Sequence, residues 1–241
     1  MNEEIWAKSC HISPSMITLD MCNLEQQCRM VEEAGLEMIH VDILDGHFSP
    51  SMPLGLDTVK QLRKKTKLEF EAHVMVTEPQ FFVDELIEAG ASQIVFHIET
   101  CDHVDGMLNY IHSKGIRAGV ALKPATPLYE LEYILDKCDA VLLMLINPGF
   151  AQMKGESQTA YSARKIHDLH EMITARGLDT RVLDTKVILD GRISPENINT
   201  YGMSGEADIF VAGSTCIKKD DQIGSLQILK AMEDEINSRR V

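Results

Sequence analysis

Two histidines and two aspartates stand at or near the ends of three apolar segments of this chain. His40 and Asp42 lie two residues apart in the first segment, His73 ends the second, and Asp190 ends the third. In a β-strand, residues two apart point to the same face, so His40 and Asp42 converge while their apolar neighbours face the other way. Two imidazoles and two carboxylates together suit a divalent metal such as zinc, manganese or iron(II).

Each of these side chains also has a simpler explanation. A single histidine at a strand end is usually a hydrogen-bonded structural residue, and an Asp-Gly pair is usually a turn. The presence of all four at strand ends favours the metal site. Asp45 and His47 lie beyond the strand end and are predicted to form a turn or support the ligands. His97 and Glu99 repeat the alternating pattern on another strand, where a supporting and a purely structural role are both open.

Short apolar segments alternate with amphipathic ones along the whole chain, which predicts strand–helix units. Strands are expected near residues 10–14, 38–43, 67–74, 93–98, 116–122, 139–146, 186–190 and 208–212. Helices are expected near residues 23–35, 53–66, 79–90, 104–114, 128–137, 159–177, 195–204 and 221–238. Eight such units without a linker predict one domain over residues 1–241, a (β/α)8 TIM barrel of the α/β class, with an open doubly wound sheet as the main rival.

Glycines at three neighbouring strand ends suggest a second feature of the barrel mouth. Gly149 follows the sixth strand, Gly191 the seventh, and Gly213-Ser214 the eighth. Glycine lets backbone N–H groups approach an anion, and loops after strands seven and eight commonly bind phosphate in such barrels. Tight turns explain the same glycines. The polar connection at residues 151–159 is expected to be a mobile loop over the site.

The bulk composition excludes several classes of partner. The chain has 241 residues and a net charge of −14, which argues against nucleic-acid binding. No apolar run approaches the roughly 18 residues that suggest a membrane span. The acidic N-terminus lacks the order of a signal peptide. Six scattered cysteines, with no C-x-x-C pair, indicate reduced thiols and a cytoplasmic protein.

Six segments between about residues 10 and 215 carry recognisable motifs. They are Ile12-Ser13-Pro14-Ser15, the run from His40 to Phe48, His73-Val74-Met75, Pro124-Ala125-Thr126-Pro127, Asn147-Pro148-Gly149-Phe150 and Val211-Ala212-Gly213-Ser214. In this order they resemble the ribulose-phosphate 3-epimerase family, and the long His-Val-Asp motif is highly specific.

The resemblance implies a metal-dependent epimerisation at C3 of a ketose phosphate. By that resemblance, one divalent metal, zinc before iron(II), manganese or cobalt, is held by the residues matching His40, Asp42, His73 and Asp190. The two aspartates also serve as the acid–base pair. Ser15 matches a serine that contacts substrate, and Met75 and Met144 match methionines beside the reacting carbons; Leu44 stands where the family has a third. The family also implies a homo-oligomer built on dimers.

The sequence departs from the family at the phosphate end of the site. Ala151 and Gln152 replace a Gly-Gly pair, and Arg192 replaces the second glycine of an Asp-Gly-Gly loop. A guanidinium binds phosphate oxygens in a bidentate manner, so Arg192 is expected to help hold the phosphate; the alternative is an ion pair with Glu196. Lys123 replaces an asparagine that often precedes the Pro-Ala-Thr-Pro segment.

Three rival functions remain open on the sequence. The first is epimerisation of a hexulose 6-phosphate such as allulose 6-phosphate, because His97-Ile98-Glu99-Thr100 slightly resembles that branch of the family. The second is an aldolase or decarboxylase on the same barrel, for which Lys123 is the candidate Schiff-base residue. The third is a non-catalytic barrel that binds a sugar phosphate. Metal content would separate the third from the enzyme, because a binder has no need of a stoichiometric metal.

Overall fold

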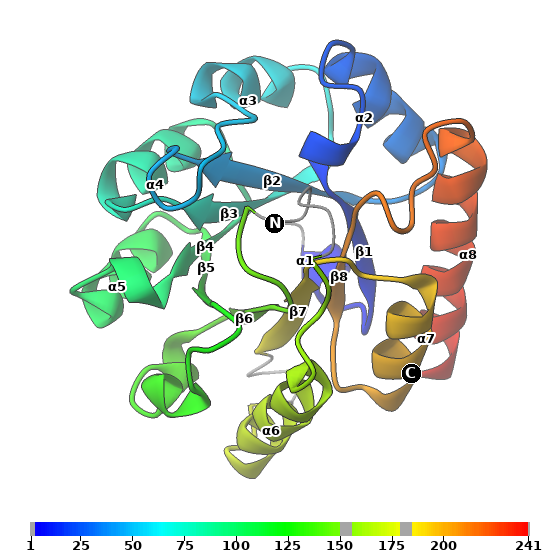
Figure 1. Ribbon diagram of the computed structural model, residues 1–241. Coiled ribbons are helices and arrows are strands. Elements are labelled where there is room, and N and C mark those ends of the chain that lie inside the picture. Colours follow the sequence, from blue (N-terminus) through cyan, green and yellow to red (C-terminus); the bar gives the residue numbers. More distant parts are fainter. Residues whose placement is uncertain (1–2, 150–155, 179–184, 241) are drawn as a thin grey trace.

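Eight parallel strands form the centre of the protein in the computed structural model, which describes residues 3–149, 156–178 and 185–240. The strands pair in the order β1-β8-β7-β6-β5-β4-β3-β2, and a bridge between Ser15 and His40 joins the two ends of the sheet. The predicted (β/α)8 barrel is therefore confirmed (Figure 1). The strands are β1 (His11–Pro14), β2 (Met38–Leu44), β3 (Glu69–Met75), β4 (Gln93–His97), β5 (Arg117–Leu122), β6 (Ala140–Met144), β7 (Lys186–Asp190) and β8 (Ile209–Ala212).

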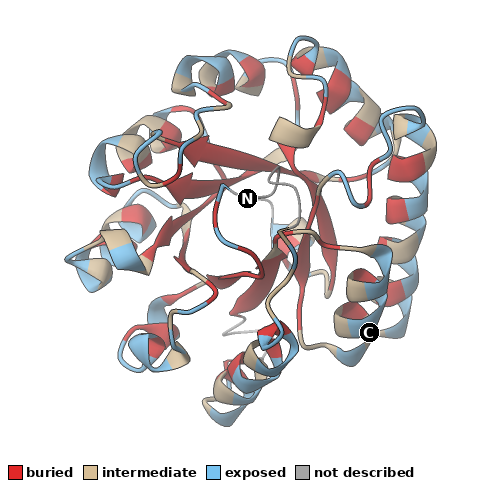
Figure 2. Cartoon of the chain, viewed as in Figure 1, coloured by how far each residue is buried: buried red, intermediate tan, exposed pale blue. Residues whose placement is uncertain are grey.

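Helices surround this ring of strands on the outside (Figure 1). Each buries one face against the sheet and exposes the other, as the alternation of burial along the helices in Figure 2 shows. That amphipathic pattern is what predicted them from the sequence. The helices are α1 (Glu3–Trp6), α2 (Leu24–Glu33), α3 (Leu56–Arg63), α4 (Pro79–Glu88), α5 (Val104–Ser113), α6 (Ser162–Ala175), α7 (Pro195–Ser204) and α8 (Gln222–Arg239), with short 3-10 turns η1 (Met16–Thr18) and η2 (Ile98–Thr100).

The connection between β5 and β6 differs from the prediction. In place of a helix over residues 128–137 there are two 3-10 turns, η3 (Leu128–Leu131) and η4 (Leu135–Lys137). Hydrogen bonds such as that from Ile134 N to Leu131 O span three residues instead of four. Leu131 and Leu135 are buried all the same, so an apolar spacing of three or four residues is satisfied by either kind of helix.

The short helix α1 was not expected and closes the bottom of the barrel. It places Trp6, which is buried, against the barrel interior together with Met38, Val95 and Leu142. The guanidinium of Arg117 lies 4.3 Å from the centre of the Trp6 ring. Together with ion pairs to Glu3 at 3.0 Å and Asp139 at 3.7 Å, this cation–π contact accommodates the charged side chain at the bottom of the barrel.

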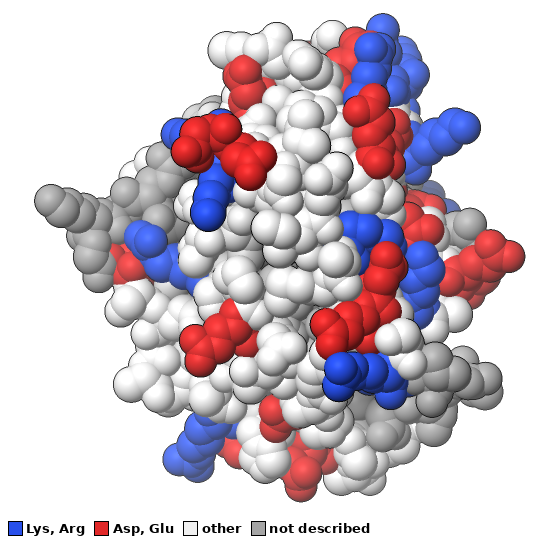
Figure 3. All heavy atoms as spheres, turned by 90° about the vertical axis from the view of Figure 1, so that its right-hand side faces the viewer, with Lys and Arg blue, Asp and Glu red and all other residues white. Residues whose placement is uncertain are grey.

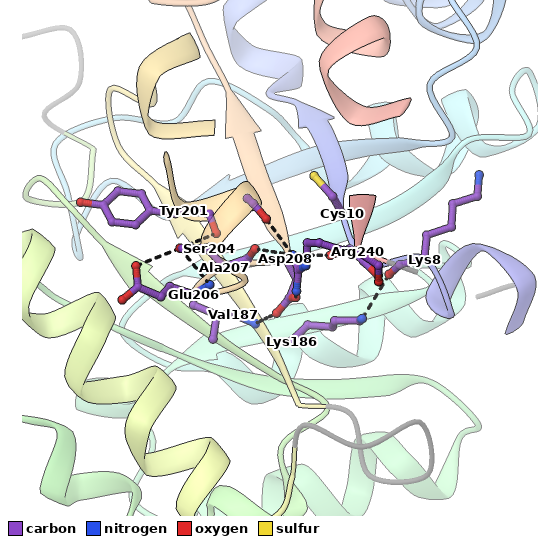
Figure 4. Close-up of polar contacts among 12 residues, drawn as sticks. Lys8, Cys10, Lys186, Val187, Tyr201, Ser204, Glu206, Ala207, Asp208 and Arg240 are labelled. Carbon is purple, nitrogen blue, oxygen red and sulfur yellow. Dashed lines mark hydrogen bonds and ion pairs between the residues drawn. The ribbon is translucent and has the colours of Figure 1, made fainter. Parts of the chain in front are cut away.

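Arg240, just beyond α8, fastens the C-terminal end of the chain to this bottom face. Its Nη2 donates to Asp208 Oδ1 at 2.9 Å, and its Nη1 donates to the carbonyl oxygens of Ser9, Gly202 and Ala207 (Figure 4). Asp208 in turn accepts from the backbone N–H of Val187 at 2.9 Å. One guanidinium therefore ties together the segments before β1 and β8, and α7.

The outer surface around α8 carries interspersed charges of both signs, as the face in Figure 3 shows. Several of these charges form pairs within the helix. Lys230 contacts Glu233 and Asp234, and Arg239 contacts Glu235 at 2.8 Å. Glu233 is buried and also accepts from the backbone N–H of Ile12 at 2.8 Å. Asp234, Glu235 and Arg239, in contrast, lie on the exposed face, where such pairs contribute little stability individually.

Two further features concern cysteines and membranes. All six cysteines are free thiols, in agreement with the sequence prediction. Among the helices that the structure describes, none is long and apolar enough to cross a membrane.

We expect Arg240→Ala to lower the free energy of unfolding by about 2–4 kcal/mol, because it leaves Asp208 and three carbonyl groups without their donor. Chemical denaturation monitored by circular dichroism is the measurement. Arg239→Ala is the matched control: its side chain is 66% exposed, and we expect a loss of about 0.5 kcal/mol or less. Equal losses in both variants would contradict this account of the C-terminal contact.

Candidate active site

Four predicted ligands meet at the C-terminal mouth of the barrel. His40 and Asp42 come from β2, His73 from β3 and Asp190 from the end of β7. One donor atom from each residue lies within 4.8 Å of the others. The register between β2 and β3 sets Asp42 opposite His73, so both point into the same space. The strand-end positions noted in the sequence are therefore brought together by the fold.

His40 is held by carboxylates on both of its ring nitrogens. Its Nδ1 is 2.8 Å from Glu71 Oε2, and its Nε2 is 3.1 Å from Asp42 Oδ1 and 3.9 Å from Asp190 Oδ2. His40 and Glu71 are completely buried. Glu71 is a supporting residue that the sequence analysis missed, although it faces inward on β3 two residues before His73.

His73 is held through Nε2, the ring nitrogen on the side away from the carboxylates. Its Nε2 lies 3.0 Å from Nε2 of His97, and His97 Nδ1 lies 2.9 Å from Glu99 Oε2. His73 Nδ1 is buried and has no hydrogen-bond partner among the described residues, although it lies 3.5 Å from Asp190 Oδ2 and 3.7 Å from Asp42 Oδ1. The structure thus places His97 and Glu99 behind the cluster and outside its ligand set.

Burial and the neighbouring charges shift the pKa values of the residues in and behind the cluster. Burial opposes a positive charge on His40, but the charges of Glu71 and Asp42 outweigh it and raise the pKa of His40 well above its usual value. Burial likewise opposes ionisation of Asp42, yet the charge of His40 and its hydrogen bond lower the pKa of Asp42. Burial lowers the pKa of His97 to about 4, which leaves that ring neutral at pH 7. Without an ion, positive charge on His40 therefore offsets carboxylate charge at the centre of the cluster.

This donor set fits a divalent cation. A buried imidazole nitrogen without a partner, His73 Nδ1, points at two carboxylates, and His40 Nε2 points at the same two. As metal ligands the two imidazoles must give up any extra proton, and together with the two carboxylates they then carry a charge of −2, which one divalent ion would balance. The cluster could thus hold a metal ion through His40, Asp42, His73 and Asp190. The contacts from Glu71 and His97 to the distal ring nitrogens are the kind that orient metal-bound histidines.

Residues predicted to form turns or touch substrate occupy the surroundings of the cluster. Asp45 accepts backbone N–H bonds from His47, Phe48 and Thr77, all at 2.8 Å, so it shapes the turn after β2 and does not join the ligand set. Ser15 donates its hydroxyl to Asp42 Oδ2 at 2.8 Å. This contact orients Asp42 directly, which the family resemblance had not suggested.

Two buried methionines border the cluster. Met75 ends β3, and Met144 ends β6 opposite Asp190 in the strand register. Leu44, at the end of β2, pairs with Met75. Leu44 and Met75 follow Asp42 and His73 by two residues, so they share their strand faces, and all three apolar side chains are almost completely buried.

Two of the three glycines at the neighbouring strand ends leave no room for a side chain. A Cβ on Gly149 (φ 74°) would lie 1.7 Å from Ser49 Oγ, and a Cβ on Gly191 (φ 110°) would lie 2.7 Å from Ile146 Cγ1. Gly213 has a Thr18 methyl 3.4 Å from such a Cβ, and Ser214 beside it is exposed. Close packing therefore accounts for Gly149 and Gly191 without any bound ligand.

The loop after β7 holds the only non-glycine residue with positive φ among those described, Arg192 at 51°. A left-handed conformation costs an ordinary residue about 1 kcal/mol. The amide of Gln158 donates to the carbonyl oxygens of Gly191 and Arg192, at 3.0 and 3.2 Å, and so holds this loop. Gln158 belongs to the connection predicted to be mobile, of which residues 151–155 lie outside the described ranges.

Comparison with known proteins agrees with this geometry. Residues 11–217 match the ribulose-phosphate 3 epimerase family. The chain belongs to this family. It is 38% identical over 210 residues to the ribulose-phosphate 3-epimerase of Methanocaldococcus jannaschii, covering 87% of this chain and 85% of that one. It is 35% identical over 211 residues to that of Escherichia coli (strain K12), covering 87% and 90%. The predicted family, and an isomerase of carbohydrate phosphates as the enzyme class, are thereby confirmed.

Solved structures of lower sequence identity support the fold. Phosphoribosyl anthranilate isomerase from Thermus thermophilus superposes with a TM-score of 0.60 at 16% identity, covering 94% of this chain and 99% of that one. A tryptophan synthase chain from Mycobacterium tuberculosis gives 0.62 at 12% identity, covering 97% and 94%. At such identities the likeness concerns the barrel alone.

We expect the purified protein to bind one divalent metal per chain and His73→Ala to lose most of it, because a buried ligand nitrogen is removed. Elemental analysis after controlled loading with zinc is the measurement. His112→Ala is the control: His112 contacts Asp139 on the outside of the barrel, and we expect full metal content. Unchanged metal in His73→Ala would remove that residue from the site.

Proposed function

We propose that this protein epimerises a ketose phosphate of the ribulose 5-phosphate/xylulose 5-phosphate type at C3. The observation that carries the proposal is the meeting of two carboxylates, Asp42 and Asp190, in one buried cluster from strands that are not neighbours. Epimerisation needs one group to take a proton and another to return it on the opposite face. The proposed substrate class, a ketose phosphate, is taken from the relatives in this family.

The two carboxylates are suited to this exchange. One accepts the C3 proton, which leaves an enediolate, and the other delivers a proton to the opposite face and inverts the carbon. Ser15 donates to Asp42 Oδ2, and His40 Nε2 lies 3.1 Å from Asp42 Oδ1, so both contacts together hold this carboxylate in one orientation. The side chain of Asp190 is 15% exposed and that of Asp42 is 6% exposed, so both border the mouth from which substrate would enter.

The proposed metal ligands are His40, Asp42, His73 and Asp190, with zinc as the first expectation and iron(II), manganese or cobalt as alternatives. When bound, such an ion would act as a Lewis acid toward the negative charge that develops on the substrate oxygens. Met75 and Met144 would keep water from the reacting carbon.

The phosphate would lie at the loops that carry Gly149, Gly191, Arg192, Gly213 and Ser214. Gly191 and Arg192 share one loop, and their carbonyl oxygens are turned to Gln158, which leaves the loop in a fixed shape. Arg192 supplies a positive charge at these loops in a protein whose net charge is negative. A fixed cation beside glycine backbone is the kind of site that binds phosphate oxygens.

Lys123 does not favour the rival Schiff-base chemistry. Its ammonium lies 4.1 Å from the centre of the Phe48 ring, above that aromatic face. The cluster of two histidines and two aspartates supplies the groups that epimerisation needs, without a lysine.

A dimer-based homo-oligomer and a cytoplasmic location stay predictions. Light scattering tests the oligomeric state.

We expect Asp190→Asn to lower turnover roughly 10²-fold or more, because it removes one member of the acid–base pair. The assay uses ribulose 5-phosphate, with allulose 6-phosphate in parallel to distinguish the two substrates. Metal content is measured separately, since the substitution also removes a ligand charge. Asp168→Asn, on the exposed face of α6, is the control. Near-normal turnover by Asp190→Asn with ribulose 5-phosphate would refute the two-aspartate mechanism.

We expect Arg192→Gly to raise KM for the phosphorylated ketose by roughly tenfold or more, because a charged contact to phosphate is lost. The same substitution relieves the left-handed backbone, so the folded state should not be destabilised. Arg192→Asn is the companion variant: asparagine tolerates this conformation and carries no charge. Steady-state kinetics decides. If KM stays unchanged or falls in both variants, Arg192 does not bind the phosphate.

A further inference from the structure

The ring of His97 lies between His73 and the carboxylate of Glu99, beneath the surface of the site. The three side chains form a continuous hydrogen-bonded row, with 3.0 Å between the two Nε2 atoms and 2.9 Å from His97 Nδ1 to Glu99 Oε2. Both histidine side chains are completely buried. A bond between two imidazole nitrogens requires one donor and one acceptor, so this row has a direction.

The direction is fixed from the carboxylate end. The ionised carboxylate of Glu99 only accepts, so His97 donates from Nδ1. A neutral imidazole carries one N–H, which makes Nε2 of His97 an acceptor. His73 must therefore donate from its own Nε2. In the neutral form of His73, which is the form that can bind a cation, the lone pair is then on Nδ1, the atom that lies 3.5 Å from Asp190 Oδ2 and 3.7 Å from Asp42 Oδ1.

Glu99 is itself held in one orientation by the loop after β5. Its Oε1 accepts from the backbone N–H of Lys123 at 2.7 Å and from the hydroxyl of Thr126. The ammonium of Lys165 fastens the same loop from α6 by donating to the carbonyl oxygens of Lys123 and Pro124, at 2.9 and 3.1 Å. Only Oε2 of Glu99 is turned to His97. The two oxygens of the carboxylate therefore cannot exchange their partners.

An aromatic ring covers this row. The Phe48 ring lies 4.6 Å from the His97 ring, and the ammonium of Lys123 lies on Phe48. With His97 completely buried, bulk water cannot offer its nitrogens another partner. The arrangement differs from that at His40, where a single carboxylate, Glu71, contacts Nδ1 directly.

We propose that Glu99 and His97 are positioning residues that set the protonated nitrogen of His73 and thereby reserve its Nδ1 for a divalent cation. This inference deepens the proposed function and rests on its metal site. Glu99 and His97, which are not ligands themselves, would thus decide which ring nitrogen of His73 binds the cation.

The variant Glu99→Gln tests the direction of the row. Lys123 N–H can only donate, so the carboxamide oxygen must take the place of Oε1. Its NH2 group then faces His97 Nδ1 and donates to it. The proton of His97 moves to Nε2, His73 Nε2 becomes an acceptor, and the proton of neutral His73 occupies Nδ1. The size of the side chain is preserved, while the nitrogen needed by the cation is blocked.

Two measurements read the effect without turnover. In metal-free protein labelled with ¹⁵N-histidine, long-range ¹H–¹⁵N correlation reports which nitrogen of His97 carries the proton, with His97→Asn for assignment. Zinc affinity is measured by chelator competition. We expect His97 to be protonated on Nδ1 in the unaltered protein and on Nε2 in Glu99→Gln, with zinc affinity lowered roughly 10–100-fold in the variant. Glu206→Gln is the control, because Glu206 Oε1 contacts His167 Nδ1 at 2.8 Å on the outer surface, and its zinc affinity should be unchanged.

The outcomes separate this inference from the proposed function. A proton on Nε2 of His97 in the unaltered protein overturns the inference even if Glu99→Gln fails to fold. Normal zinc affinity in a folded Glu99→Gln overturns it as well, whether or not turnover is lost. Epimerase activity of the unaltered protein is assayed independently. If that activity is absent while the proton shift and the zinc loss occur, the proposed reaction is wrong and the positioning role stands.

Discussion

The structure of the site follows from the need to partner buried carboxylates. Asp42, Asp190 and Glu71 lie in or beside the barrel interior, where an isolated negative charge is costly. Two histidines supply the partners: His40 faces Glu71 across β2 and β3, and His73 faces Asp42 in the same register. A slip of one residue in either strand would turn the groups of that strand to the other face. The strand register is therefore as important to the site as the identity of the residues.

Barrel closure is the second requirement. Along the ladders, β7 is five steps from β2, which in an open sheet at about 4.8 Å per strand would separate Asp190 from Asp42 by about 24 Å. The bridge between Ser15 and His40 brings the sheet edges together, and the two carboxylates then meet. Ser15 contributes twice, through this bridge and through its hydrogen bond to Asp42. Arg240 and α1 stabilise the opposite end, away from the chemistry.

Much of this arrangement could be predicted from the sequence, because buried strands leave a strong apolar pattern. All eight strands lie where they were expected, and the four clustered residues were identified from their places at strand ends. The two 3-10 turns after β5 were missed because their apolar spacing is also helical. The buried Glu71 was missed because a glutamate inside a strand gives no sign of its partner. Which ring nitrogen of His73 faces the carboxylates depends on His97 and Glu99, and only tertiary contacts show it.

Isotope exchange at the substrate tests the central claim most directly. The unaltered protein, loaded with zinc, is incubated with ribulose 5-phosphate in D2O, and the recovered sugar phosphates are examined by NMR. A carboxylate that takes the C3 proton and a second one that returns a solvent-derived proton predict deuterium at C3 alone, with both C3 epimers present at equilibrium. Recovery of both epimers without deuterium at C3, or deuterium at C1, would contradict the account.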